Sequence, residues 1–288
     1  MKNAYLNDLQ IHQNDTNIGY WLNPKIQGLE APGIRLPSFE RPNVDGAFIP
    51  NQLYGARPIT LEGVVSGNGS LALYRTRRRA FEAVARIYRP GGVVTPITFK
   101  FKTMDDLELQ IPVYVKKNDF PDILLMKGDY KLDLIAPDIR IFSQVEHTEQ
   151  INIFQGGGMA IPMGIVMDMS IGGSVESVIT NAGDITSFPT IIIRGPIDDP
   201  IISNQSSGDS FSLNYTLTSS AERIEIDIET RTVLYYADDT TAPINIRQYF
   251  SGDWWELQPG TNAIKLVVSD VSDAGYMVIK WRDAYLGV

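Results

Sequence analysis

The chain has 288 residues, of which 43 % are hydrophobic and 20 % charged, a composition sufficient for packed cores and for two domains of ordinary size. It contains no cysteine, which excludes disulfides, thiolate metal sites and cysteine nucleophiles. The net charge of −9 is uneven: residues 1–144 hold 18 basic and 15 acidic side chains, residues 145–288 hold 7 and 19, and the acidic half repels nucleic acid.

Residues 1–60 contain short apolar stretches that prolines interrupt. Prolines at this density rule out a long helix and favour extended segments joined by turns. The first clear strand is expected at residues 58–63. The prolines of this region are Pro24, Pro32, Pro37, Pro42, Pro50 and Pro58.

An amphipathic helix is predicted from residue 71 to about residue 89, with Ser70 as its N-cap. Arg77 projects from the middle of the apolar arc, where a charge needs a partner, and Glu62 on the preceding strand is the expected partner. The apolar arc holds Leu73, Tyr74, Ala80, Phe81, Val84, Ala85, Ile87 and Tyr88. The opposite arc holds the candidates for subunit contacts, Arg75, Arg78, Arg79, Arg86 and Arg89.

This arginine-rich arc also resembles a basic nucleic-acid patch. No aromatic residue interleaves with the arginines, however, and the whole chain is acidic. A solvated face or a salt-bridging face between subunits is therefore the preferred interpretation.

Strands are expected to follow the helix at residues 98–102, 107–115 and 130–135. Acidic residues lie beside these strands: Asp105, Asp106, Glu108, Asp119 and Asp122.

The second half predicts a β-sandwich. Apolar residues occupy every odd position from 161 to 171, and the same alternation recurs at 211–217 and 224–228. Three consecutive glycines at 156–158 indicate a loop near the domain boundary. The predicted fold is therefore mainly β with one helix, in two domains, 1–144 and 145–288, with the C-terminal residues candidates for packing back on the first domain.

Neither a catalytic nor a metal site emerges from the sequence. The two histidines, His12 and His147, lie in different predicted domains, so a histidine triad or metal cluster is not expected. The acidic pairs at 198–199 and 238–239 are typical of turns, since adjacent strand residues point to opposite faces. By the same reasoning one ring of Trp254 and Trp255 should lie in the core, and the pair is the candidate site for a glycan or a partner. No cofactor is expected.

Several segments together resemble the distal tail protein family of long-tailed phages. In the first half these are residues 44–49 (VDGAFI), 54–63 (YGARPITLEG) and 131–142 (KLDLIAPDIRIF). In the second half they are residues 181–184 (NAGD), 188–196 (FPTIIIRGP), 254–262 (WWELQPGTN) and 279–286 (IKWRDAYL). The resemblance implies a ring-forming first domain like a tail-tube subunit and a galectin-like β-sandwich as the second.

The resemblance also implies a structural role without catalysis. Distal tail proteins form a ring, usually of six copies, that joins the tail tube to the tip or baseplate. Their partners are the tube protein, a tail-associated spike or lysin, and receptor-binding proteins. The resemblance further implies a channel through which DNA passes without specific binding, and an acidic lining would suit it because basic side chains would bind phosphates. The candidates for this lining are Asp105, Asp106, Glu108, Asp119 and Asp122. The expected location is the tip of the virion tail, after assembly in the host cytoplasm and without membrane contact. The alternative function is a carbohydrate-binding module that contributes to adhesion to the host surface.

Overall fold

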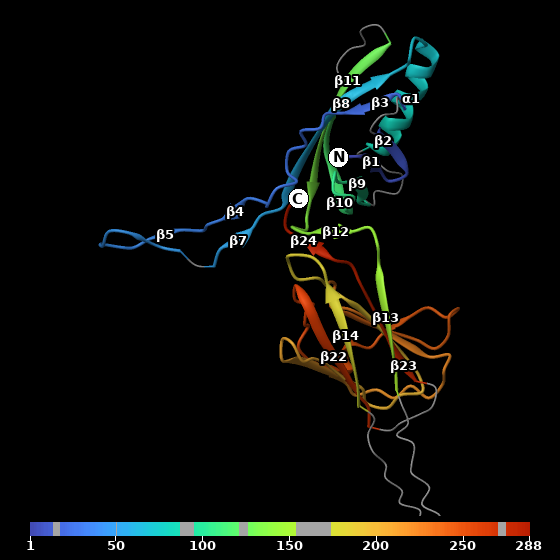
Figure 1. The fold of residues 1–288 in the computed structure, drawn as a ribbon. Helices are drawn as coiled ribbons and strands as arrows, with labels where there is room; N and C mark the ends of the chain where they lie inside the picture. The colour runs from blue at the N-terminus through green and yellow to red at the C-terminus, as the bar shows by residue number, and fades with distance from the viewer. Residues whose placement is uncertain (14–17, 50, 87–94, 121–125, 154–173, 270–274) are drawn as a thin grey trace, which may run out of the picture. The chain divides into compact units, whose positions relative to one another are not determined.

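The computed structural model describes residues 1–13, 18–49, 51–86, 95–120, 126–153, 174–269 and 275–288 (Figure 1). The described chain divides into two compact units. The first contains Met1–Gln144 together with Tyr285–Val288, and the second contains Val145–Ala284. The chain therefore leaves the first unit once and returns to it for its last four residues. The mainly β fold with one α-helix, predicted from the sequence, is confirmed.

The first unit is built on antiparallel strands in the order β2-β1-β9-β10-β11-β8-β3. Strand β10 bends at a register shift between Val115 and Lys117, which lets one long strand join both halves of the sheet. The strands are β1 (Asn3–Leu6), β2 (Leu9–Gln13), β3 (Tyr20–Leu22), β8 (Arg57–Ser66), β9 (Ile97–Lys102), β10 (Glu108–Asp119), β11 (Lys127–Ala136) and β12 (Ile141–Ser143), with β24 (Ala284–Tyr285) pairing with β12.

Alternating side chains build the core of the first unit. On β9, Ile97, Phe99 and Phe101 are buried while the residues between them point outward. Strands β10 and β11 contribute buried residues with the same period, and helix α1 (Leu71–Val84) packs on this core. Ser70 caps α1 by accepting a hydrogen bond from the Leu73 amide, as predicted.

The helix buries less of its apolar arc than the sequence predicts. Tyr74 and Phe81 are buried, whereas Leu73 and Ala80 are exposed, because only one narrow strip of α1 contacts the sheet. The predicted last turn, including Arg89, lies outside the described residues.

The second unit contains two further antiparallel sheets within its described residues. One has the order β13 (His147–Asn152), β23 (Tyr276–Trp281), β15 (Thr190–Arg194), β18 (Arg223–Asp227), β19 (Thr232–Tyr236) and β20 (Ile244–Asn245). The other has the order β14 (Ser174–Asn181), β22 (Gly260–Val267), β16 (Ile201–Asn204), β17 (Asp209–Leu213) and β21 (Phe250–Gly252), which a short 3-10 turn, η1 (Arg247–Tyr249), precedes.

A second hydrophobic core fills this unit. Ile224 and Ile226 are fully buried, as the alternation at 224–228 predicts. In the segment 211–217 the strand ends at Leu213, but Leu217 is still buried where it bridges to Ile197. The alternating segment 161–171 and the glycines at 156–158 lie outside the described residues.

Candidate functional site

A long hairpin arm leaves the first unit between β3 and β8 (Figure 1). It consists of two short ladders, β4 (Ile34–Arg35) with β7 (Leu53–Tyr54) and β5 (Phe39–Glu40) with β6 (Ala47–Phe48). Every described residue from 33 to 54 is exposed. The exposed large hydrophobic residues of the arm are Ile34, Leu36, Phe39, Val44, Phe48, Ile49, Leu53 and Tyr54.

This exposure is unusual for apolar side chains. An isolated two-stranded hairpin is at best marginally stable in water, and contiguous exposed apolar surface marks an interaction site. The arm is therefore a candidate contact for another protein. The proline-rich composition indicated its extended backbone, but the sequence pattern did not indicate that its apolar residues lie outside a core.

A buried arginine fixes the base of the arm. Arg57, fully buried, donates from Nη1 to the carbonyls of Gly28 (2.9 Å) and Glu30. From Nη2 it donates to Ile139 (2.7 Å) and Leu286 (2.5 Å). Burial lowers the pKa of the guanidinium, and the nearby charges of Asp138 and Glu30 oppose that shift.

The arm base is therefore held to two other segments of the first unit. The Val288 amide adds a hydrogen bond to the Leu29 carbonyl at 3.1 Å. Gly28 has a φ of +93°, and a Cβ there would lie 1.9 Å from the Pro58 carbonyl oxygen, so only glycine fits. The role of Arg57 could not be predicted from the sequence, because a single arginine beside a strand gives no signal of its burial.

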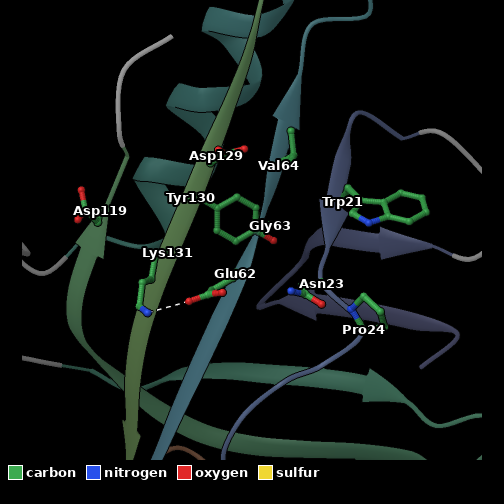
Figure 2. A pocket seen from close by; sticks show the side chains of 10 residues that line it. All are labelled: Trp21, Asn23, Pro24, Glu62, Gly63, Val64, Asp119, Asp129, Tyr130 and Lys131. Atoms are coloured by element: carbon green, nitrogen blue, oxygen red, sulfur yellow. Dashed lines mark hydrogen bonds and ion pairs between the residues drawn. The ribbon is translucent and has the colours of Figure 1, made fainter. Parts of the chain in front are cut away.

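A groove of about 510 Å³ lies on the face of β3, β8 and β11 opposite the helix (Figure 2). Its central row follows the strand register, which pairs Trp21 with Val64 and Val64 with Asp129. Figure 2 shows Trp21 at one wall and Asp119 at the other. The groove is lined by Trp21, Asn23, Pro24, Glu62, Gly63, Val64, Asp119, Asp129, Tyr130 and Lys131.

The charges in the groove are unequally compensated. Lys131 bonds Glu62 at 2.7 Å, and this bond raises the pKa of the lysine. Lys117 lies 3.4 Å from Asp119. Asp129 has no ion-pair partner among the described residues. The groove thus combines an exposed aromatic ring, an aliphatic side chain and an unpaired carboxylate.

The expected pair between Arg77 and Glu62 is not formed. Arg77 donates from Nη1 to the Ser66 carbonyl at 2.6 Å, while Glu62 is bonded by Lys131. Ser66 lies four residues beyond Glu62 on the extended strand β8, about 13 Å away, and this separation explains the error.

The arginines proposed for subunit contacts differ in their surroundings. Arg75, Arg79 and Arg86 are exposed. Arg78 instead bonds Glu82 at 2.7 Å and lies over the ring of Phe120, with its Cζ 5.5 Å from the ring centroid. Arg89 lies outside the described residues.

The proposed channel-lining acids lie at the connection between β9 and β10. Asp105 is exposed there. Asp106 bonds Lys2 at 2.6 Å and Lys102 at 3.3 Å, and these bonds lower its pKa. Glu108 bonds Lys102 at 3.1 Å. The lysines therefore compensate two of these three acids; Asp119 lies in the groove instead, and Asp122 is outside the described residues.

Trp254 and Trp255 lie in different environments, as alternation predicts. The assignment of both residues to a binding site is therefore wrong for Trp255. Trp255 is only 2 % exposed, stacks on Phe211 and belongs to the core, so its ring cannot contact a glycan or a partner. Trp254 is partly buried, stacks on Phe250 with a centroid distance of 4.0 Å, and lies beneath Arg247.

The acidic turns of the second unit have local structural roles. Asp238 accepts hydrogen bonds from the backbone and side chains of Thr240 and Thr241, which lower its pKa to about 2. Asp239 pairs with Arg223 and with Arg194. Asp198 accepts a hydrogen bond from the Thr216 hydroxyl.

Each histidine has its own structural environment. His12 is buried and contacts the edge of Trp21, and burial lowers its pKa. His147 bonds Asp283 at 2.9 Å and stacks on Trp281. Within the described ranges, no group of three or more histidine, aspartate or glutamate side chains is arranged to hold a metal ion. In the same part of the chain, no helix combines the length and the apolarity needed to span a bilayer.

Comparison with known proteins adds a family match for the second unit. Residues 182–285 match the family described as siphovirus-type tail component, C-terminal domain. A comparison with curated protein sequences gave no match.

Two solved structures are similar over nearly the whole chain. One is the Dit protein of phage SPP1, described as a paradigm of the hub adsorption apparatus in phages that infect Gram-positive bacteria. It shares 13 % identity, with 97 % of each chain covered and a TM-score of 0.62. The other is a chain of the phage P2 baseplate in its activated conformation with Ca, with 10 % identity, full coverage of both chains and a TM-score of 0.53. At these identities the similarity establishes the fold.

Proposed function

We propose that this chain, a siphovirus-type phage tail component, forms a ring that joins the tail tube to the tip or baseplate of the tail. The observation that carries the proposal is the arm, whose apolar side chains project from the first unit with no described partner in the same chain. A monomer gains nothing from exposing these side chains, but an oligomer buries them.

The geometry of the first unit suits a closed oligomer. If the arm of one copy binds a different surface on the next, the contact between copies is heterologous, and heterologous contacts that close by rotation give rings. Six copies is the number that the family resemblance implies. The first unit carries 18 basic and 15 acidic side chains, so the passage of DNA without specific binding depends on which of these side chains line the channel and not on the net charge of the whole chain.

The two units take different partners in this proposal. The first unit builds the ring and meets the tube protein. The second unit carries its apolar residues in its own core and anchors the spike or lysin and the receptor-binding proteins. The role is structural, and the protein acts at the virion tail tip after assembly in the host cytoplasm.

Light scattering of the purified protein over a wide concentration range tests the proposal, with negative-stain electron microscopy of the same samples. We expect closed rings with a central channel and a mass that does not grow with concentration beyond one ring. A protein that stays monomeric at all concentrations, both alone and mixed with the tube protein, would contradict it.

A further inference from the structure

We propose that the tip of the arm docks into the groove on β3, β8 and β11 of a second copy of the chain. This inference rests on the proposed ring and specifies the two surfaces that meet in it. The occupant is a second copy because the same unit carries both halves of a complementary pair that do not meet within one chain.

The arm tip presents an aromatic and cationic cluster, which we call the knob: Phe39, Arg41 and Phe48. Phe39 and Phe48 are cross-strand partners and are 63 % and 59 % exposed. The guanidinium carbon of Arg41 lies 4.7 Å from the centroid of the Phe48 ring. The Arg41 amide bonds the Gly46 carbonyl at 3.1 Å, which closes the turn beside the knob.

The groove presents the matching chemistry in one row. Trp21, 56 % exposed, Val64 and Asp129 are neighbours across three strands. Adjacent strands lie about 4.8 Å apart, so the row extends over roughly 10 Å, the width of a cross-strand pair of phenylalanines with an adjoining arginine. Aromatic rings then contact Trp21 and Val64, and the guanidinium reaches Asp129, which has no ion-pair partner among the described residues.

The arm's own groove does not receive its knob. The Gly55 amide bonds the Gly33 carbonyl at the start of the arm, and the knob lies six to eight extended residues beyond this point, roughly 20–26 Å away. The knob residues remain exposed in the described chain, and Figure 1 shows the arm directed away from β3 and β8. Each copy therefore has a knob to give and a groove to receive one. In the proposed ring the two are engaged by different neighbours, which makes the contact heterologous.

The chain contains no cysteine, so a disulfide test is free of background. The Phe48→Cys and Val64→Cys proteins are purified separately, mixed and oxidised. We expect a disulfide between one copy of each. The matched control replaces Val64→Cys with Val178→Cys, an equally simple change at a residue that is 61 % exposed in the second unit, and we expect no such product.

A charge exchange tests the same contact without a covalent bond. We expect Arg41→Asp and Asp129→Arg each to weaken assembly by roughly tenfold, and the two changes together to restore it. Circular dichroism of each variant checks that it is folded.

The outcomes separate this inference from the proposed function. Rings with the disulfide and the charge rescue support both. Rings with neither result overturn the knob and groove contact and leave the ring intact. A protein that does not assemble, with the arm unchanged, overturns the ring and this contact together. Cross-linking of Phe48→Cys to a different tail protein in assembled particles, and not to Val64→Cys, also overturns the contact.

Discussion

In the arm, Phe39 and Phe48 are 63 % and 59 % exposed, whereas in the second unit Phe211 and Trp255 are 1 % and 2 % exposed. Both regions are β-structure with aromatic side chains, but only the second unit has an opposing sheet to cover them. Aromatic side chains stabilise a fold only when something covers them. This difference supports the proposal that the arm is one half of an interface.

Replacing phenylalanine by alanine should lower monomer stability in the core but weaken assembly in the arm. Phe81→Ala removes a fully buried ring that contacts Tyr130 and Phe120, and should lower the free energy of unfolding by about 3–5 kcal/mol. Phe48→Ala should leave the stability of the monomer unchanged but weaken assembly. Urea unfolding at a dilution that keeps the protein monomeric, beside light scattering at high concentration, measures both. An equal loss of monomer stability in the two variants would show that the arm is covered within its own chain.

A second pair of substitutions compares a buried and a partly exposed residue of one sequence motif, Trp255 and Trp254. Trp255→Ala should cost about 3–5 kcal/mol because it leaves a cavity in the core. Trp254→Ala should cost about 1 kcal/mol, the value of one aromatic stack. Thermal unfolding of both variants compares the two losses of stability. A glycan array with the wild type and Trp254→Ala tests the alternative adhesive function: a sugar signal that disappears in the variant would favour it.

These pairs also indicate what the sequence can and cannot predict. Alternation predicted the buried residues of the strands at 211–213 and 224–227 and the separation of Trp254 from Trp255, because it depends only on local geometry. The pairing of Glu62 was wrong, since it depends on which residue of β11 lies opposite, and register between distant strands is not a local property. The arm was predicted as extended but not as exposed. The apolar residues at 34–54 give the same sequence pattern whether their side chains are buried in a core or exposed for an intermolecular contact.

Arg57 holds the base of the arm to the core of the first unit. Arg57→Met should lower the free energy of unfolding by about 3 kcal/mol, because buried carbonyl groups lose their donor. Hydrogen exchange should quicken around residues 28–30 and 286–288 while the second unit is unaffected. Arg223→Met is the control, because this arginine pairs with Asp239 in the second unit, away from the arm base. Equal exchange at the arm base in the two variants would contradict the anchoring role of Arg57.

The smallest expected effect concerns acid stability of the second unit. The folded-state pKa of Asp238, about 2, lies below its ordinary value of 3.8 because threonine hydrogen bonds favour the charged form. The contribution of the ionised Asp238 side chain to the stability of the fold is therefore present above about pH 4, and it is lost as the pH falls from about 4 to about 2. Asp238→Asn should reduce the pH dependence of the urea midpoint in this window and leave that of the arm's assembly unchanged. If the urea midpoint of Asp238→Asn depends on pH as that of the wild type does, Asp238 does not contribute to the acid stability of the second unit.

The most direct test of the central claim removes the arm alone. Because Gly33 and Gly55 are already hydrogen-bonded neighbours, residues 34–54 can be replaced by an Asn-Gly turn without disturbing β3 or β8. Light scattering of this variant and of the wild type at equal concentrations compares their masses. We expect a closed oligomer for the wild type and a folded monomer for the variant. The same oligomer in both would contradict it.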